Sequence, residues 1–122
     1  MTASLSDAAA FPEQLETIRS GMRALSKSQP ATMKSFSALH AASSGSGALD
    51  SKTKELIALA IAVTARCDGC IAYHTHDVLE AGASREEIME ALSVAILMGG
   101  GPSVIYATHV VEAMDQFENA SR

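Results

Sequence analysis

Residues 52–82 read KTKELIALAIAVTARCDGCIAYHTHDVLEAG, and this segment decides the fold. Asp50 stands just before it as a helix N-cap, and residues 56–63 are almost wholly apolar. An apolar stretch of this kind predicts a helix that is buried nearly all round. Asp68 or a neighbour then begins another helix, which ends at Gly82, a residue suited to the position after a helix C-terminus. The segment therefore predicts two consecutive helices at the centre of the fold.

Helical patterns flank this segment on both sides. They are predicted from Pro12 to about Lys27, from Pro30 to about Ser43, from residue 85 to residue 98, and from Pro102 to near Asn119. Ser84 and Glu87 form a capping box before the third of these, and the triplet Gly99–Gly101 breaks the chain after it. The sequence shows no strand pattern and predicts an all-α fold of about six helices, with a CxxC motif at the start of a central helix.

The amino-acid composition agrees with close-packed helices in one domain. Apolar residues make up 48% of the 122-residue chain but aromatic residues only 4%, and there is no tryptophan. Alanine, methionine and the aliphatic residues must therefore fill the interior, which suits helices better than a sheet. A chain of this length is expected to form a single domain over residues 1–122, with residues 1–10 flexible.

Charge and hydropathy exclude two classes of partner. Nine basic residues against fourteen acidic ones give a net charge of −5, and no cluster of lysine and arginine indicates nucleic-acid binding. The N-terminus lacks signal-peptide features, and glycines and a proline interrupt the longest apolar run, residues 91–107, so no membrane segment is expected. We expect a cytoplasmic protein, in which thiols stay reduced and cysteines are catalytic, redox-active or metal-binding.

Both cysteines and two of the four histidines lie within residues 65–77, ARCDGCIAYHTHD. On a helix, Cys67, Cys70 and His74 share one face, with His74 within about 40° of both cysteines. Two cysteines spaced CxxC at a helix start can form a disulfide, and the free backbone N–H groups there favour a thiolate. His74, one turn after Cys70, can exchange a proton with its sulfur. The pattern is that of a thiol pair with an acid/base beside it.

Other chemistries remain open for this cluster. Zinc would accept the same three side chains, with Glu55, His109 or a neighbouring subunit as a fourth ligand. Haem attachment needs CxxCH and is excluded because Ile71 follows Cys70. In the simplest alternative, the cysteines are small buried hydrophobic residues beside a hydrogen-bonded core histidine. The residues alone therefore leave a redox site, a metal site and plain core packing in competition.

A longer stretch of the sequence resembles a known family. The run KELIALAIAVTARCDGCIAYHTHDVLEAGASREEIMEAL, followed by GGGPSVIYATHVVEAM, resembles the AhpD-like alkylhydroperoxidase branch of the carboxymuconolactone decarboxylase family. The resemblance extends over about residues 34–117. Redox members of that family carry the pattern E-x11-C-x2-C-x3-H, which this chain matches with Glu55, Cys67, Cys70 and His74.

This resemblance implies an all-helical fold and a thiol-dependent peroxidase activity. A thiol would reduce hydrogen peroxide or a small organic hydroperoxide, and an external dithiol of the lipoyl or thioredoxin kind would reduce the resulting disulfide. No bound cofactor and no metal are expected. Family members form homotrimers or homohexamers, and a largely apolar chain with few aromatic residues has surface to bury between subunits.

The resemblance also implies a role for each residue of the pattern. Cys70 is the peroxidatic thiol and Cys67 the resolving thiol. Glu55 orients His74, or relays protons through Cys67 and a water molecule. Local physics leaves the order of the thiols open, because Cys67 lies nearer the helix start whereas Cys70 has the histidine one turn further on.

The remaining candidates concern the substrate pocket. Tyr73, Tyr106 and His109 could line it, although His109 lies in an apolar stretch where a core or interface histidine is the stronger expectation. His40 and His76 are expected to be structural or exposed. Two alternative functions stay in competition: a decarboxylase acting on a carboxylated lactone, whose family members generally lack the paired cysteines, and a non-enzymatic redox-sensing or zinc-binding oligomer.

Overall fold

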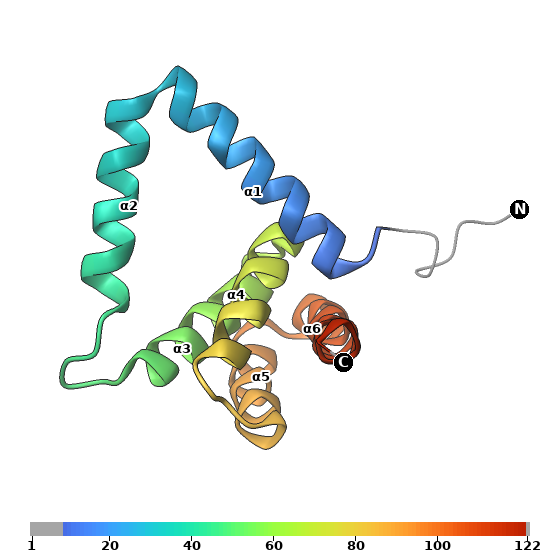
Figure 1. The fold of residues 1–122 in the computed structure, drawn as a ribbon. Coiled ribbons are helices and arrows are strands. Elements are labelled where there is room, and N and C mark those ends of the chain that lie inside the picture. The colour runs from blue at the N-terminus through green and yellow to red at the C-terminus, as the bar shows by residue number, and fades with distance from the viewer. Residues whose placement is uncertain (1–8, 122) are drawn as a thin grey trace, which may run out of the picture.

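The computed structural model describes residues 9–121, and these form a bundle of helices (Figure 1). The helices are α1 (Phe11–Ser28), α2 (Pro30–Ser44), α3 (Ser51–Thr64), α4 (Asp68–Glu80), α5 (Arg85–Gly99) and α6 (Gly101–Ala120). Within the described residues there is no strand. The predicted all-α fold of about six helices is confirmed, whereas the flexibility expected for residues 1–10 falls almost wholly outside the described part of the chain.

The helix boundaries follow the capping signals in the sequence. The Asp50 side chain accepts a hydrogen bond from the Thr53 N–H at 2.8 Å, which caps α3. Ser84 and Glu87 form both hydrogen bonds of the predicted capping box at the start of α5. The Lys52 ammonium lies 2.8 Å from the Glu87 carboxylate and is the main reason why the pKa of Glu87 lies below its usual value. This contact links the starts of α3 and α5.

The core lies between α3, α4, α5 and α6, which contact one another closely. Its largest fully buried apolar side chains are aliphatic residues and a methionine, as the composition predicts: Leu59, Val63, Ile71, Val78, Ile88, Val110 and Met114. No helix within residues 9–121 is both long enough and apolar enough to cross a membrane.

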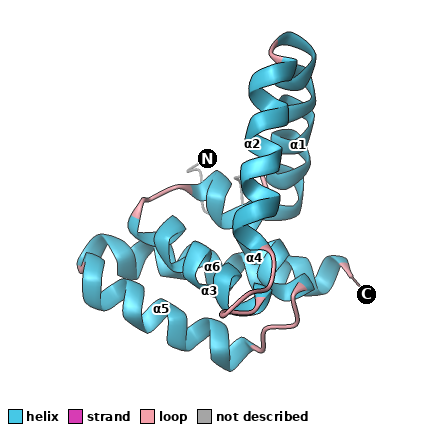
Figure 2. Ribbon diagram, turned by 90° about the vertical axis from the view of Figure 1, so that its left-hand side faces the viewer, coloured by secondary structure: helices cyan, strands magenta, loops and turns pink. Residues whose placement is uncertain are grey.

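Helices α1 and α2 form an arm that projects from the four-helix body (Figure 2). The first turns of α1 dock on the body through Phe11 and Leu15, which are buried. Helix α2 contains no buried residue, and its Phe36 and Leu39 side chains are exposed. The arm therefore meets the body mainly at its base.

The burial predicted for residues 56–63 is wrong on one side of α3. Leu59 and Val63 are fully buried, but Ile57 and Ile61 are 46% and 59% exposed. The reason is that α4, α5 and α6 cover only one side of the helix. An apolar face of α3 is left uncovered in the single chain.

Candidate active site

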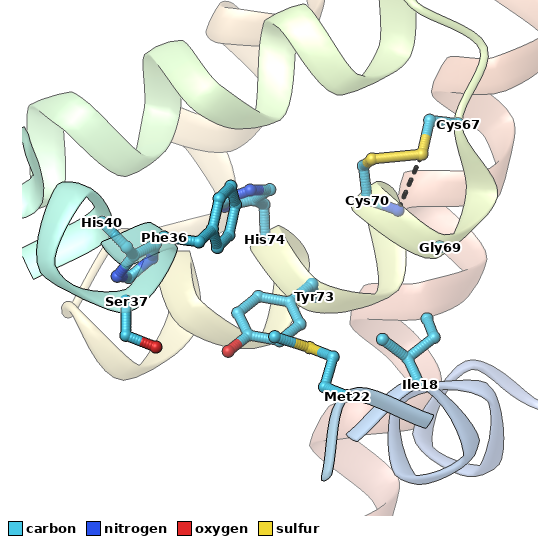
Figure 3. A pocket seen from close by; sticks show the side chains of 10 residues that line it. All are labelled: Ile18, Met22, Phe36, Ser37, His40, Cys67, Gly69, Cys70, Tyr73 and His74. Carbon is cyan, nitrogen blue, oxygen red and sulfur yellow. Dashed lines mark hydrogen bonds between the residues drawn. A yellow bond between two sulfur atoms is a disulfide. The ribbon is translucent and has the colours of Figure 1, made fainter. Parts of the chain in front are cut away.

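The two cysteines form a disulfide at the start of α4 (Figure 3). Their Cα atoms are 5.2 Å apart, and Cys67 is the N-cap of the helix. The Cys67 sulfur accepts a hydrogen bond from the backbone N–H of Cys70 at 3.1 Å. Cys70 is exposed, while Cys67 is half-buried. Both sulfurs thus lie at a helix N-terminus, where the helix dipole favours a thiolate once the disulfide is reduced.

The connection before the cysteines is short and held in an unusual conformation. Only residues 65–67 separate α3 from α4. Arg66 adopts a left-handed conformation with φ of 57°, which costs a non-glycine residue about 1–2 kcal/mol. Hydrogen bonds from the backbone N–H groups of Arg66 and Cys67 to the last turn of α3 hold the turn. The turn folds α4 back against α3.

This antiparallel packing brings Glu55 on α3 into contact with His74 on α4. The carboxylate Oε2 lies 2.9 Å from the imidazole Nδ1. Glu55 is buried, and the His74 side chain is 24% exposed. A carboxylate bound to Nδ1–H keeps the proton on that nitrogen, which leaves Nε2 of the neutral ring free to accept a proton. The pair is thus arranged as an oriented base.

A cavity of about 440 Å³ opens beside the disulfide and His74 (Figure 3). Three helices line it with Ile18 and Met22 from α1, Phe36, Ser37 and His40 from α2, and Cys67, Gly69, Cys70, Tyr73 and His74 from α4. The arm supplies the apolar wall opposite the cysteines. The volume suits a small organic molecule. Gly69 lets the arm approach closely, because a Cβ atom there would lie 3.2 Å from the Ile18 side chain.

The sequence also matches a model of a known protein family. The model described as carboxymuconolactone decarboxylase family matches residues 30–113, which is more than half of the chain. The chain belongs to the carboxymuconolactone decarboxylase family.

Solved structures and curated relatives agree with this membership. A family protein from Legionella pneumophila is 43% identical, with a TM-score of 0.86 over 88% of this chain and 96% of that one. A family protein from Thermotoga maritima is 33% identical, with a TM-score of 0.79 over 89% and 92% of the two chains. An uncharacterized protein of Cupriavidus necator is 39% identical over 102 residues, or 84% of this chain and 90% of that protein.

The similarity to a named enzyme is more limited. Alkyl hydroperoxide reductase AhpD of Mycolicibacterium paratuberculosis is 34% identical over 67 residues. The matched part is 55% of this chain but only 38% of that protein. The resemblance to the AhpD-like branch is thus found again, and it covers part of this chain and a smaller part of the longer enzyme.

The structure places the predicted pocket residues in two different locations. Tyr73 lines the cavity. Tyr106 and His109 are not among its lining residues, because His109 Nδ1 lies 2.6 Å from the Asp68 carboxylate on the α6 side of α4. The Tyr106 ring packs beside His109, with 4.9 Å between the ring centroids. His40 is exposed, as expected, and also lines the cavity, a role that nothing in the sequence indicated.

Two candidate sets of metal ligands can be compared with this geometry. The set Cys67, Cys70 and His74 would need two thiolates, and the disulfide form offers none. His40, Glu55 and Asp77 place ligand atoms within 4.8 Å of one another. Their carboxylates, however, already bind histidines, Glu55 to His74 and Asp77 to His76 at 3.0 Å. The side chains at this site are therefore arranged as a thiol pair beside an oriented base.

Proposed function

We propose that this protein is a thiol-dependent peroxidase that reduces hydrogen peroxide or small organic hydroperoxides. The observation that carries the proposal is that the CxxC pair and His74, which is hydrogen-bonded to the buried Glu55 behind it, line one largely apolar cavity. An oriented base beside a thiol pair supplies what peroxide reduction requires. The partial similarity to AhpD supports the same chemistry.

In the proposed cycle, the Cys70 thiolate attacks the terminal oxygen of the peroxide. The O–O bond breaks, the alcohol or water leaves with a proton, and Cys70 becomes a sulfenic acid. The thiol of Cys67 then displaces water from this sulfur and forms the disulfide. Cys70 is assigned the first step because it is the more exposed of the two residues and has His74 one turn further along α4.

Glu55 and His74 handle the protons of this cycle. Within residues 9–121, no hydrogen bond joins His74 directly to either sulfur, so the proton passes through a water molecule or the bound peroxide. Nε2 of His74 accepts the thiol proton while Glu55 holds Nδ1–H. The same histidine then returns a proton to the departing oxygen.

An external dithiol completes the cycle in this proposal. Exposure of Cys70 allows a thiol of the lipoyl or thioredoxin kind to attack the disulfide at that sulfur. This attack frees Cys67 as a thiol and leaves a mixed disulfide on Cys70; the second thiol of the same dithiol then releases reduced Cys70 and closes its own disulfide. The cycle requires no bound cofactor and no metal, and we place it in the cytoplasm, where such dithiols are kept reduced.

The alternative decarboxylase function fits the cavity less well. A carboxylated lactone is bound most strongly where arginine or lysine pairs with its carboxylate groups. Among the described residues, no lysine or arginine lines the cavity. An uncharged hydroperoxide does not depend on such pairing.

The proposed cycle predicts that both thiols are lost together. After full reduction, a pulse of one peroxide per chain should remove two free thiols, and a dithiol should restore both. Thiol titration with mass spectrometry measures the change, and a variant with both cysteines replaced by serine serves as the control. Thiols that persist after the pulse, or one zinc per purified chain, would contradict the proposal.

We also propose that the chain works as a homotrimer or homohexamer. Exposed apolar side chains lie on three helices of the body: Ile57, Ile61, Val94, Leu97, Met98, Val104 and Ile105. Leu97 and Met98 are the most exposed, at 79% and 76%. An apolar surface of this kind is typical of an interaction site. A symmetric assembly of identical chains would cover it on every subunit.

Light scattering should therefore give a mass of three or six chains at micromolar concentration. The double substitution Leu97→Glu with Met98→Glu should lower this mass, because it places charge where the subunits meet. Ser20→Glu, at an exposed polar position on α1 outside this apolar surface, is the matched control and should leave the mass unchanged. A monomeric parent protein would refute the assembly.

A further inference from the structure

A second histidine–carboxylate pair lies directly beside the cysteines and has no part in the proposed cycle. Asp68, the first residue of α4, follows Cys67 in the chain. Its Oδ1 atom lies 2.6 Å from Nδ1 of His109 on α6. The hydrogen bond therefore ties the first turn of the cysteine helix to a helix far away in sequence.

The surroundings of His109 fix the orientation of its ring. The side chain is only 17% exposed, and the Tyr106 and Phe11 rings lie at centroid distances of 4.9 and 6.4 Å. Three helices, α1, α4 and α6, thus meet at this histidine. Asp68 is 46% exposed, and among the described residues His109 is its hydrogen-bond partner. Arg66, the basic residue closest to Asp68 in the sequence, is exposed. It forms no ion pair within residues 9–121.

This pair is arranged in the opposite way to Glu55–His74. There the carboxylate lies on a neighbouring helix and binds the histidine of α4. In the Asp68–His109 pair the carboxylate lies on α4 itself, next to Cys67 in the sequence, and the histidine lies on α6. A negative charge beside a thiol disfavours the thiolate, and a hydrogen-bond donor to that charge offsets the effect.

We propose that Asp68 and His109 form a positioning couple that sets the dithiol–disulfide equilibrium of Cys67 and Cys70. Asp68 holds the equilibrium toward the disulfide, because its charge disfavours the thiolates of the reduced form. The His109 N–H moderates this effect and holds the first turn of α4 in place. A disulfide whose reduced form is stabilised is the stronger oxidant. The couple thus adjusts how readily an external dithiol regenerates the protein, an inference that rests on the proposed thiol cycle.

Two substitutions at this single hydrogen bond test the couple. Asp68→Asn removes the charge but keeps an oxygen that accepts the His109 N–H. His109→Phe keeps a ring between Tyr106 and Phe11 but removes the donor and leaves the charge. The measurement is the equilibrium constant between dithiol and disulfide in a buffer of reduced and oxidised dithiothreitol at about pH 9.5, where a thiol with a pKa of about 8.5 is mostly thiolate.

The two variants should shift this equilibrium in opposite directions. We expect Asp68→Asn to favour the dithiol by about three- to tenfold, since one pKa unit in a thiol corresponds to a tenfold change. A tenfold change equals about 30 mV in the reduction potential. His109→Phe should favour the disulfide by a similar factor, and His109→Gln, whose amide still donates, should return toward the parent value. Asp115→Asn on α6, which breaks the exposed Arg85 ion pair instead, should cause no shift.

Opposite signs support the couple, because a purely structural role predicts no effect or shifts in the same direction. Equal values in the parent and both variants, with helical circular dichroism retained, would overturn it. The experiment involves no peroxide, so its outcome is separate from that of the proposed function. If the protein consumes peroxide but the two variants show no opposite shifts, the peroxidase proposal stands and the proposed role of Asp68 and His109 is refuted. Opposite shifts in a protein that does not consume peroxide support the couple alone.

Discussion

The substitution Cys70→Ser is expected to abolish the reaction with peroxide, whereas Cys67→Ser should still complete one oxidation. Cys70 is the more exposed of the two residues, and His74 lies one turn further along the same helix. Cys67 is half-buried as the N-cap, which suits a thiol that acts second. Without Cys67, the sulfenic acid on Cys70 has no partner and should persist long enough to be trapped.

The measurement is single-turnover oxidation followed by mass spectrometry with a sulfenic-acid reagent. The two serine variants control for each other, because each removes one sulfur from the same turn of α4. Labelling of Cys67 in the Cys70→Ser protein would reverse the assignment. It would mean that the helix dipole, strongest at the N-cap, decides which thiol is activated.

The helices could be predicted from sequence because their ends carry local signals. Proline at Pro12 and Pro30 and the capping box of Ser84 and Glu87 act within a few residues, and the structure contains all of them. The side of α3 that is left uncovered could not be predicted. Its residues are apolar all round, and periodicity cannot tell a face packed against the same chain from an exposed one.

In the candidate site, too, some contacts could be predicted from the sequence and others could not. Glu55 and His74 meet because a turn of three residues joins their helices, so the fixed spacing in the sequence largely determines the contact. The cavity wall from the arm and the Asp68–His109 pair depend on how distant helices pack. No spacing rule links Asp68 to a histidine on α6. An apolar context for His109 suggested a buried histidine but not its partner.

The substitution His74→Gln is expected to slow the peroxide step by at least about tenfold, since a positioned acid/base group typically contributes about 10²–10⁴-fold. A free thiol has a pKa of about 8.5, so only a few per cent is thiolate at neutral pH without help. Glutamine keeps the size of the side chain and can still donate to Glu55. His76→Gln on the same helix is the matched control, because His76 binds Asp77 instead, and it should react at the parent rate.

The substitution Glu55→Gln should slow the same step more mildly, because the carboxylate acts through His74. It replaces a pure acceptor, 2.9 Å from Nδ1, by an amide that either accepts through its oxygen or donates through its nitrogen, so the tautomer with the proton on Nδ1 is no longer enforced. The double variant should then be little slower than His74→Gln alone, since residues that work as a unit lose their effect together. Single-turnover rates for both single variants and the double variant measure this coupling. Rates that multiply independently would show that Glu55 is only a carboxylate near the start of α3, and that the histidine finds its orientation without it.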